Sequence, residues 1–283
     1  MWKSPHDRKL PDFGARVLIM GVLNVTRDSF SDGGKFFSAR DALAHAEEMA
    51  AAGADIIDVG AESTRPGAKV VGEEEEMEIV VSRIAALRAE LDIPISVDTY
   101  KPSVALAAVE AGADIINDVY AVRGSLACGA PYPMAAAAAA CGAPIIVTCN
   151  DRNARKEGDF WARLKVSLRS LIEETVSAGV ARGQIAADPG VGFGKAPEEN
   201  FEIVRRMGEL RELGVPLLLG VSRKSFIREV VGPSIPALDA ATAAISGYVA
   251  ANFSADILRV HDVASSVAAV RACSKLFKRK THG

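Results

Sequence analysis

The sequence predicts an α/β protein in which one domain folds as an eight-stranded (β/α)₈ TIM barrel. Eight short apolar runs, rich in Ile, Val and Leu, recur along the chain without polar alternation, as is typical of parallel strands buried on both faces. Stretches with helical periodicity separate most of these runs. The words AGADIIDV (52–59) and AGADIINDV (111–119) repeat nearly the same helix-to-strand junction. This regular alternation favours repeated βα units over two unrelated domains.

The expected strands, in chain order, are 17–24, 54–60, 94–99, 113–119, 144–150, 185–190, 216–222 and 255–260. Helices such as 41–53 and 102–112 are expected between them. Several should end at a glycine, which favours the left-handed conformation that closes a helix: Gly53, Gly112, Gly142 and Gly214. An open doubly wound sheet is the competing fold. It is disfavoured because GVGFGK (190–195) places Lys195 where a dinucleotide fingerprint needs its third glycine.

Composition and charge limit the class of protein. The chain has 283 residues, of which 49% are hydrophobic and 24% charged, with a net charge of −3, so disordered, collagenous and disulfide-scaffold classes are excluded. A balance of 33 Lys+Arg against 36 Asp+Glu provides no polycation for nucleic acid. No apolar run is long enough to cross a membrane, and the four Cys follow no zinc spacing.

We therefore expect a cytoplasmic protein with reduced thiols and one domain over residues 1–283. Residues 1–15 are expected to be an N-terminal extension and residues 274–283 a basic C-terminal tail. The acidic run 73–76 is expected to be the solvated first turn of a helix, where carboxylates complement the helix dipole.

Polar side chains follow nearly every predicted strand. In a barrel the carboxyl ends of the strands share one mouth, where active sites lie. Carboxylates, amides and a lysine together suit an aromatic heterocycle rich in donors and acceptors, and cations after the last two strands suit a phosphate group. An alternative interpretation makes Arg259 and His261 a surface ion pair with Asp262. The polar residues at these ends are Asn24, Asp58, Glu62, Asp98, Asn117, Asp118, Asn150, Asp188, Arg223, Lys224, Arg259 and His261.

Two long segments, 24–34 and 62–68, follow the first two strands, where a minimal barrel uses about two to six residues. Both are rich in Ser, Thr, Asp and Gly, and each carries one large side chain near its centre, Phe30 and Arg65. We expect these segments to close over a substrate.

Seven sequence motifs, one at each of seven predicted strand ends, together resemble those of the dihydropteroate synthase family. They are GVLNVTRDSFSDGG, DVGAESTRPGA, SVDT, IINDV, DPGVGFGK, GVSRKSF and RVHDV, in the family's order from Val17 to about Ala269. The resemblance implies a (β/α)₈ barrel that agrees with the strand count. It also implies a transferase of folate biosynthesis. Such an enzyme condenses 6-hydroxymethyl-7,8-dihydropterin pyrophosphate with para-aminobenzoate and releases 7,8-dihydropteroate and pyrophosphate.

The resemblance also implies roles for individual residues. The catalytic set would be Asp98, Asp188 and Lys224, with Asp32 pairing Arg65 to hold the loops closed. The pterin pocket would contain Asp98, Asn117, Asp188, Lys224 and Arg259. The pyrophosphate site would contain Asn24, Arg259 and His261, with Mg²⁺ held by Asn24. The para-aminobenzoate site would contain Phe30, Thr64, Arg65, Pro66, Phe193 and Ser225. Inhibition by sulfonamides, which mimic para-aminobenzoate, and a homodimer are further expectations from the resemblance.

The end of the fifth strand departs from the family's pattern. It reads TCNDRN (148–153), where family members commonly carry a His-Met-Gln-Gly word whose Met packs against the pterin. Cys149 is expected to fill part of that space. Two alternatives therefore stay open: a non-catalytic pterin-binding paralogue, and a pterin-dependent methyltransferase on the same barrel.

Overall fold

The computed structural model describes residues 2–25, 39–63, 70–120, 132–150, 152 and 157–277. Its strands are β1 (Leu18–Asn24), β2 (Ile56–Gly60), β3 (Ile95–Asp98), β4 (Ile115–Asp118), β5 (Ile145–Thr148), β6 (Ile185–Asp188), β7 (Leu218–Leu219) and β8 (Ile257–Val260). Its α-helices are α1 (Ala39–Ala52), α2 (Glu73–Glu90), α3 (Pro102–Glu110), α4 (Pro133–Cys141), α5 (Phe160–Ser177), α6 (Pro197–Arg206), α7 (Ser225–Val231), α8 (Ile235–Asn252) and α9 (Val263–Leu276). Two short 3₁₀ helices, η3 (Arg182–Gln184) and η4 (Met207–Leu213), precede β6 and β7.

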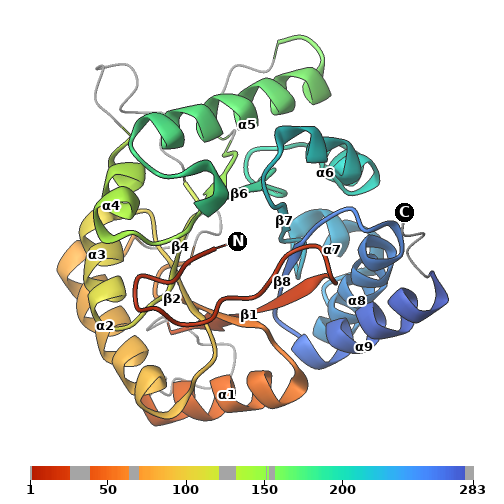
Figure 1. Ribbon diagram of the computed structural model, residues 1–283. Coiled ribbons are helices and arrows are strands. Elements are labelled where there is room, and N and C mark those ends of the chain that lie inside the picture. The colour runs from red at the N-terminus through yellow and green to blue at the C-terminus, as the bar shows by residue number, and fades with distance from the viewer. Residues whose placement is uncertain are drawn as a thin grey trace.

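The strands form one parallel sheet in the order β6-β5-β4-β3-β2-β1-β8-β7. A parallel bridge between Ala187 and Leu217 joins its two edges, and Ala187 N–H donates to the Pro216 carbonyl at 2.9 Å. Figure 1 is a view down the axis of this closed sheet and shows the helices as an outer ring around it. The predicted (β/α)₈ barrel is confirmed. The strand expected at 216–222 is shorter than predicted, because the chain turns at residues 222–223 toward α7.

The predicted glycine stops are confirmed. The backbone has φ of +100° at Gly53, +116° at Gly112, +71° at Gly142 and +69° at Gly214, all in the region that glycine adopts at little cost. Each of these glycines ends a helical segment directly before a strand. The helices therefore stop where the βα repeat requires a reversal of the chain.

Two separate apolar clusters fill the barrel and its surroundings. The larger one lies between the strands and the helices. The smaller one lies inside the barrel, at the amino ends of the strands, and includes Leu18, Met20, Ile56, Ile115, Ile146, Ala186, Leu218 and Ile257. Because side chains alternate along a strand, residues two positions later on the same strands also point into the barrel.

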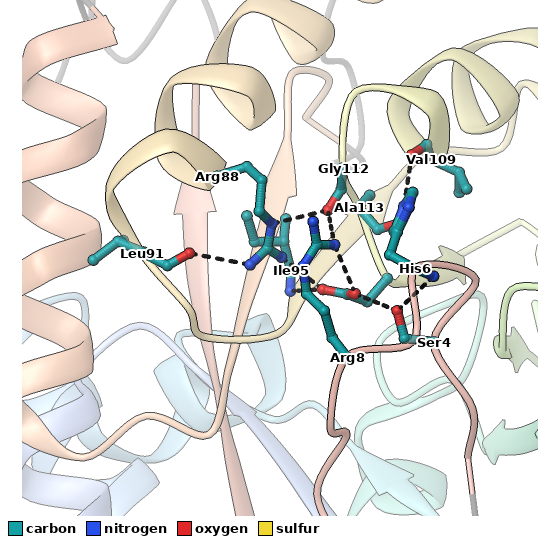
Figure 2. Close-up of polar contacts among 10 residues, drawn as sticks. Ser4, His6, Arg8, Arg88, Leu91, Ile95, Val109, Gly112 and Ala113 are labelled. Carbon is teal, nitrogen blue, oxygen red and sulfur yellow. Dashed lines mark hydrogen bonds and ion pairs between the residues drawn. The ribbon is translucent and has the colours of Figure 1, made fainter.

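The N-terminal segment closes the amino end of the barrel and is not a loose extension. Trp2 and Leu10 are each 3% exposed and belong to the cluster inside the barrel. Figure 1 shows this red segment crossing the barrel axis. Figure 2 shows its polar contacts with the junction before β4, where His6 Nε2 lies 2.9 Å from the Val109 carbonyl oxygen. The segment therefore completes the core at this end.

The aspartate of the repeated helix-to-strand motif makes the same contacts before three strands. In each case an aspartate just before a strand accepts a hydrogen bond from a backbone N–H of the preceding strand region and pairs with an arginine. The aspartates, with the backbone donor and arginine of each, are Asp55 with Ile19 and Arg16, Asp114 with Ile95 and Arg88, and Asp256 with Leu217 and Arg211. Asp114 is fully buried and also accepts from Ser4 Oγ at 2.6 Å. These aspartates fix the spacing of neighbouring strands.

The acidic run 73–76 opens α2 as predicted, but its last member is not solvated. Glu76 is fully buried and pairs with Lys101, whose Nζ also contacts Glu62 Oε2 at 2.7 Å. Glu76 shares one helix face with Val80 and Ile84, which are also buried, because residues four apart lie on one side of a helix. Its position on that face decides its burial.

No helix among the described residues has the length and hydropathy needed to cross a membrane. Among the described residues, Cys141, Cys149 and Cys273 form no disulfide. Residue Cys128 and the last residues of the expected basic tail, 278–283, lie outside the described part of the chain.

Candidate active site

A polar layer lies directly above the apolar layer inside the barrel. On four strands, the residue two positions after an inward-facing Ile or Ala has a charged or amide side chain. These side chains are Asp58 after Ile56, Asn117 after Ile115, Asp188 after Ala186 and Arg259 after Ile257. Asp98 joins them from β3, where it is paired in register with Asn117. The period of two therefore places these polar side chains together at the carboxyl ends of the strands.

Arg259 links the polar residues from its position on β8. Its Nε donates to Asp58 Oδ2 at 2.6 Å and its Nη2 donates to Asp98 Oδ2 at 2.5 Å. Burial alone would lower the pKa of Arg259, but the two carboxylates hold that pKa above its usual value. The alternative in which Arg259 forms a surface ion pair with Asp262 is wrong. Asp262 instead accepts from the Ser265 N–H at the start of α9.

The two carboxylates of the predicted pterin pocket both have raised pKa values. Burial raises the pKa of Asp98 to about 7, and the Asp58 carboxylate adds to the rise while Arg259 opposes it. Burial also raises the pKa of Asp188, with Lys224 opposing the rise. Asp188 Oδ1 accepts from the Gly190 N–H at 2.7 Å. Two buried acids whose charges are only partly compensated are ready to accept hydrogen bonds from a ligand.

Lys224, the residue directly before α7, extends its side chain toward the same polar layer. Its Nζ donates to the Val191 carbonyl oxygen and lies 4.5 Å from the centre of the Phe193 ring. Burial lowers the pKa of Lys224 to about 8, and Arg259 and Lys195 lower it further while Asp188 opposes them. The ammonium is thus a donor beside the two acids.

The GVGFGK word forms the turn that supports Lys224 and Asp188. Gly190 and Gly192 have positive φ of +72° and +79°. A Cβ at Gly190 would lie 2.0 Å from the Cys149 carbonyl oxygen, and one at Gly192 would lie 3.0 Å from Lys224 Cδ. At Gly190 a side chain would collide with the backbone just after β5, and at both positions the positive φ favours glycine.

The predicted pyrophosphate residues lie near the polar layer. His261 follows β8 directly, and Asn24 ends β1 with an exposed side chain. Ser222, which is buried, accepts from the His261 backbone N–H at 3.2 Å, and its Oγ lies 3.0 Å from His261 Nδ1. If the Ser222 hydroxyl donates to Nδ1, a neutral His261 carries its hydrogen on Nε2 and can donate it to an anion. Among the described residues, no group of three His, Cys, Asp or Glu side chains could hold a metal ion.

The end of the fifth strand differs from the expectation. Cys149 packs in the cluster between strands and helices, so the prediction that it lines the pterin wall is wrong. By alternation Thr148 points inward instead, and its Oγ1 is buried with no hydrogen bond. Arg152 lies over the Phe193 ring at 5.2 Å and donates to the Tyr120 hydroxyl at 3.0 Å. Arg152 therefore forms part of the rim here.

The para-aminobenzoate residues are only partly described. Phe193 is buried beside Lys224, and Ser225 is exposed at the start of α7. The remaining predicted residues, Phe30, Asp32, Thr64, Arg65 and Pro66, lie outside the described residues.

Asp58 is the residue at the centre of the site to which the sequence analysis gave no role. Its Oδ2 accepts from both Arg259 and Asn117. The signal was present in the junction word. AGADIIDV, AGADIINDV and ADILRV align Asp58, Asn117 and Arg259 at the same position, and the Asp58 side chain contacts both of the others.

Comparisons with known proteins identify the family to which the chain is similar. The pterin binding enzyme family matches residues 20–261 of the chain. The dihydropteroate synthase of Clostridium beijerinckii is 40% identical over 268 residues, which covers 95% of this chain and 97% of that protein.

Solved structures give the same result. A dihydropteroate synthase from Clostridium difficile, determined in the presence of pteroic acid, has a TM-score of 0.87 and 40% identity, covering 95% of this chain and 100% of that one. The Xanthomonas albilineans enzyme with 4-aminobenzoic acid has a TM-score of 0.85 and 39% identity, covering 94% of each chain. The Yersinia pestis enzyme in a sulfonamide drug complex has a TM-score of 0.83 and 36% identity, covering 92% of this chain and 94% of that one.

Proposed function

The chain belongs to the pterin binding enzyme family and, within it, to the dihydropteroate synthases, and from this membership we propose how its residues share the reaction. It is a transferase that condenses 6-hydroxymethyl-7,8-dihydropterin pyrophosphate with para-aminobenzoate and releases 7,8-dihydropteroate and pyrophosphate. The observation that carries this function is the buried polar layer, in which acids and an amide lie beside Arg259 and Lys224 at the mouth of the barrel.

This layer suits the pterin ring. Asp98 and Asp188 are buried carboxylates that accept hydrogen bonds from ring N–H groups, and Lys224 donates to a ring carbonyl or nitrogen. When pyrophosphate leaves, a positive charge spreads from the methylene carbon into the ring. The two carboxylates stabilise that charge, and the free amine of para-aminobenzoate attacks the carbon. The arylamine is itself the nucleophile and loses a proton after the new C–N bond forms, so no covalent intermediate on a Ser, Cys or His side chain is needed.

Pyrophosphate binds at Asn24, Arg259 and His261 in this proposal. Arg259 and His261 donate to phosphate oxygens and take up the charge that develops as the bond breaks. The Asn24 amide oxygen is a hard ligand on an exposed strand end, and Mg²⁺ commonly binds one or two protein oxygens together with substrate phosphates. This donor set fits Mg²⁺, which when bound would neutralise charge on the leaving group.

Para-aminobenzoate is assigned to Phe193 and Ser225 together with Phe30, Thr64, Arg65 and Pro66. Phe193 supports this assignment, since its buried ring offers an apolar surface beside the pterin-binding Lys224. By the family's pattern, Asp32 would pair with Arg65 when the two loops close. Closure excludes water, which would otherwise compete for the methylene cation. A sulfonamide is expected to compete with para-aminobenzoate at this site.

We expect the affinity for the pterin to have a narrow bell-shaped dependence on pH. Pterin binding needs Asp98 ionised, and its pKa of about 7 means that binding falls as pH drops below this value. It also needs Lys224 protonated, and its pKa of about 8 means that binding falls as pH rises above that value. Calorimetry with 6-hydroxymethyl-7,8-dihydropterin, which has no phosphate to titrate, should show the highest affinity between the two values. Constant affinity from pH 6 to pH 9 would contradict both assignments.

We also propose a homodimer that associates through α8 and α9. An apolar groove of about 480 Å³, lined by Gly247 and Cys273, lies between these helices. Tyr248, Leu276 and Phe277 are exposed beside it, and clustered exposed apolar side chains are typical of interaction surfaces. Sedimentation velocity should give twice the chain mass, and Tyr248→Glu should shift the protein toward the monomer. A monomeric wild type would overturn this proposal.

The function is tested directly with the purified protein, the pterin pyrophosphate, Mg²⁺ and para-aminobenzoate. Pyrophosphate release and dihydropteroate are measured in the same samples. We expect both products in equal amounts and only when Mg²⁺ is present. Pterin binding without either product would identify a non-catalytic paralogue. In that case Thr148 to Asn153 is the first segment to exchange for that of an active relative.

A further inference from the structure

Asp58 is a buried acid at the centre of the polar layer, and the reaction as described leaves it without a role. Its side chain is fully buried, and its Oδ2 accepts from Arg259 Nε at 2.6 Å and from Asn117 Nδ2 at 3.1 Å. Both donors belong to the proposed pterin pocket. We propose that Asp58 is a positioning residue, which sets the orientation of the Asn117 amide and of the Arg259 guanidinium before the pterin binds.

Beside Asp58 the Asn117 amide has one favourable orientation. An ionised carboxylate accepts hydrogen bonds and donates none, so it selects the amide NH₂ group and repels the amide oxygen. Asn117 Oδ1 is therefore turned away from Asp58, and it is buried without a hydrogen bond. An unpaired buried acceptor costs free energy until a donor reaches it. The 2-amino group, N3 and N8 of a dihydropterin carry such donors.

The Arg259 guanidinium is held in the same way by carboxylates from two strands. Asp58 on β2 binds its Nε, and Asp98 on β3 binds its Nη2. Two contacts fix the plane of this rigid group. Without the charge of Asp58, Arg259 would turn fully onto Asp98 and occupy carboxylate oxygens that the pterin needs. Asp58 thus keeps Asp98 available for the substrate.

This role also has an electrostatic consequence that a purely structural residue would not have. The charged groups that act on Asp98 include Arg259, which lowers its pKa, and three carboxylates that raise it, Asp58, Glu76 and Asp118. Lys224 also interacts with Asp98, and Asp188 acts on Arg259. Removing the charge of Asp58 should therefore move the acidic limb of the pH profile to lower pH.

The test uses Asp58→Asn, which keeps the side-chain volume and removes the charge. Affinity for 6-hydroxymethyl-7,8-dihydropterin, measured by calorimetry, is expected to fall about 10- to 100-fold, as for the loss of charge-assisted hydrogen bonds. The KM for para-aminobenzoate should stay unchanged, and the acidic limb of kcat/KM should move to lower pH. If Asp58→Asn does not fold, Asp58→Ala, which leaves room for water, is measured in the same way.

Asp114→Asn is the matched control. Asp114 is equally buried and pairs with Arg88 at 2.6 Å, but it lies at the opposite end of the barrel. This variant should lower Tm and leave pterin affinity and the pH profile unchanged. Unchanged pterin affinity in Asp58→Asn, or an equal loss in Asp114→Asn, would overturn the role of Asp58.

The role of Asp58 rests on the proposed function, but the two can fail separately. Pterin binding by the wild type is measured first and needs no turnover. A wild type that binds the pterin and forms no dihydropteroate would refute the function, while the effect of Asp58→Asn on binding would still decide the positioning role.

Discussion

Asp98→Asn should abolish pterin binding. The substitution removes the carboxylate that, in our proposal, accepts from the pterin ring, and it leaves a neutral amide in its place. We expect affinity for 6-hydroxymethyl-7,8-dihydropterin to fall by at least about 100-fold, because a hydrogen bond to a charged group contributes strongly in a buried site. The protein should remain folded, since Arg259 still pairs with Asp58 at 2.6 Å.

Asp118→Asn provides the control for this measurement. Asp118 is equally buried and follows Asn117 on β4, but it faces the other side of the strand and contacts the Tyr132 hydroxyl. Its substitution should leave pterin affinity close to that of the wild type, as measured by calorimetry at pH 8. Wild-type affinity in Asp98→Asn would refute the pocket assignment.

Arg259→Met should cost both activity and stability. The variant leaves the buried carboxylates of Asp58 and Asp98 without their shared cation, and breaking such a buried pair typically costs about 3 to 5 kcal/mol. The loss should be larger at pH 8 than at pH 5.5. Asp98, whose pKa is already about 7 with Arg259 present, would be protonated and uncharged at the lower pH. Denaturant unfolding at the two pH values measures this difference, and dihydropteroate formation should fall below detection.

Two further variants separate charge from geometry. Arg259→Lys keeps a cation but cannot hold two carboxylates with a rigid fork, so it should recover more stability than activity. Arg16→Met removes an arginine that pairs with Asp55 but is 56% exposed, and it should cost at most about 1 kcal/mol. Equal stability of Arg259→Met and the wild type at pH 8 would show that the two acids do not depend on Arg259.

The sequence predicts the barrel and the strand-end residues because both follow from short-range patterns. Unalternated apolar runs mark buried parallel strands, and polar residues at their ends must meet at one mouth. The same alternation explains the error at Cys149. Counting from Ile146, which faces the interior, Thr148 points inward and Cys149 points toward the helices.

Other features depend on contacts between distant parts of the chain, and a short-range pattern gives at most their position on a strand. The role of Asp58 follows from Arg259, which is 201 positions away, and from Asn117, which is 59 positions away. The ion pair that compensates the buried charge of Glu76 comes from Lys101, in a different βα unit. The N-terminal segment looks like a polar extension in the sequence, but Trp2 and Leu10 complete the core beneath the strands.

The buried acids at the amino end of the barrel serve stability alone, whereas those at the mouth serve both stability and substrate binding. Asp114 and the N-terminal segment stabilise one end, and Asp98 with Arg259 serves the substrate at the other. Substitutions around the mouth that break such a pair would therefore weaken the fold as well as substrate binding. Compensating changes should then accumulate at the far end, where they can restore robustness without touching either substrate.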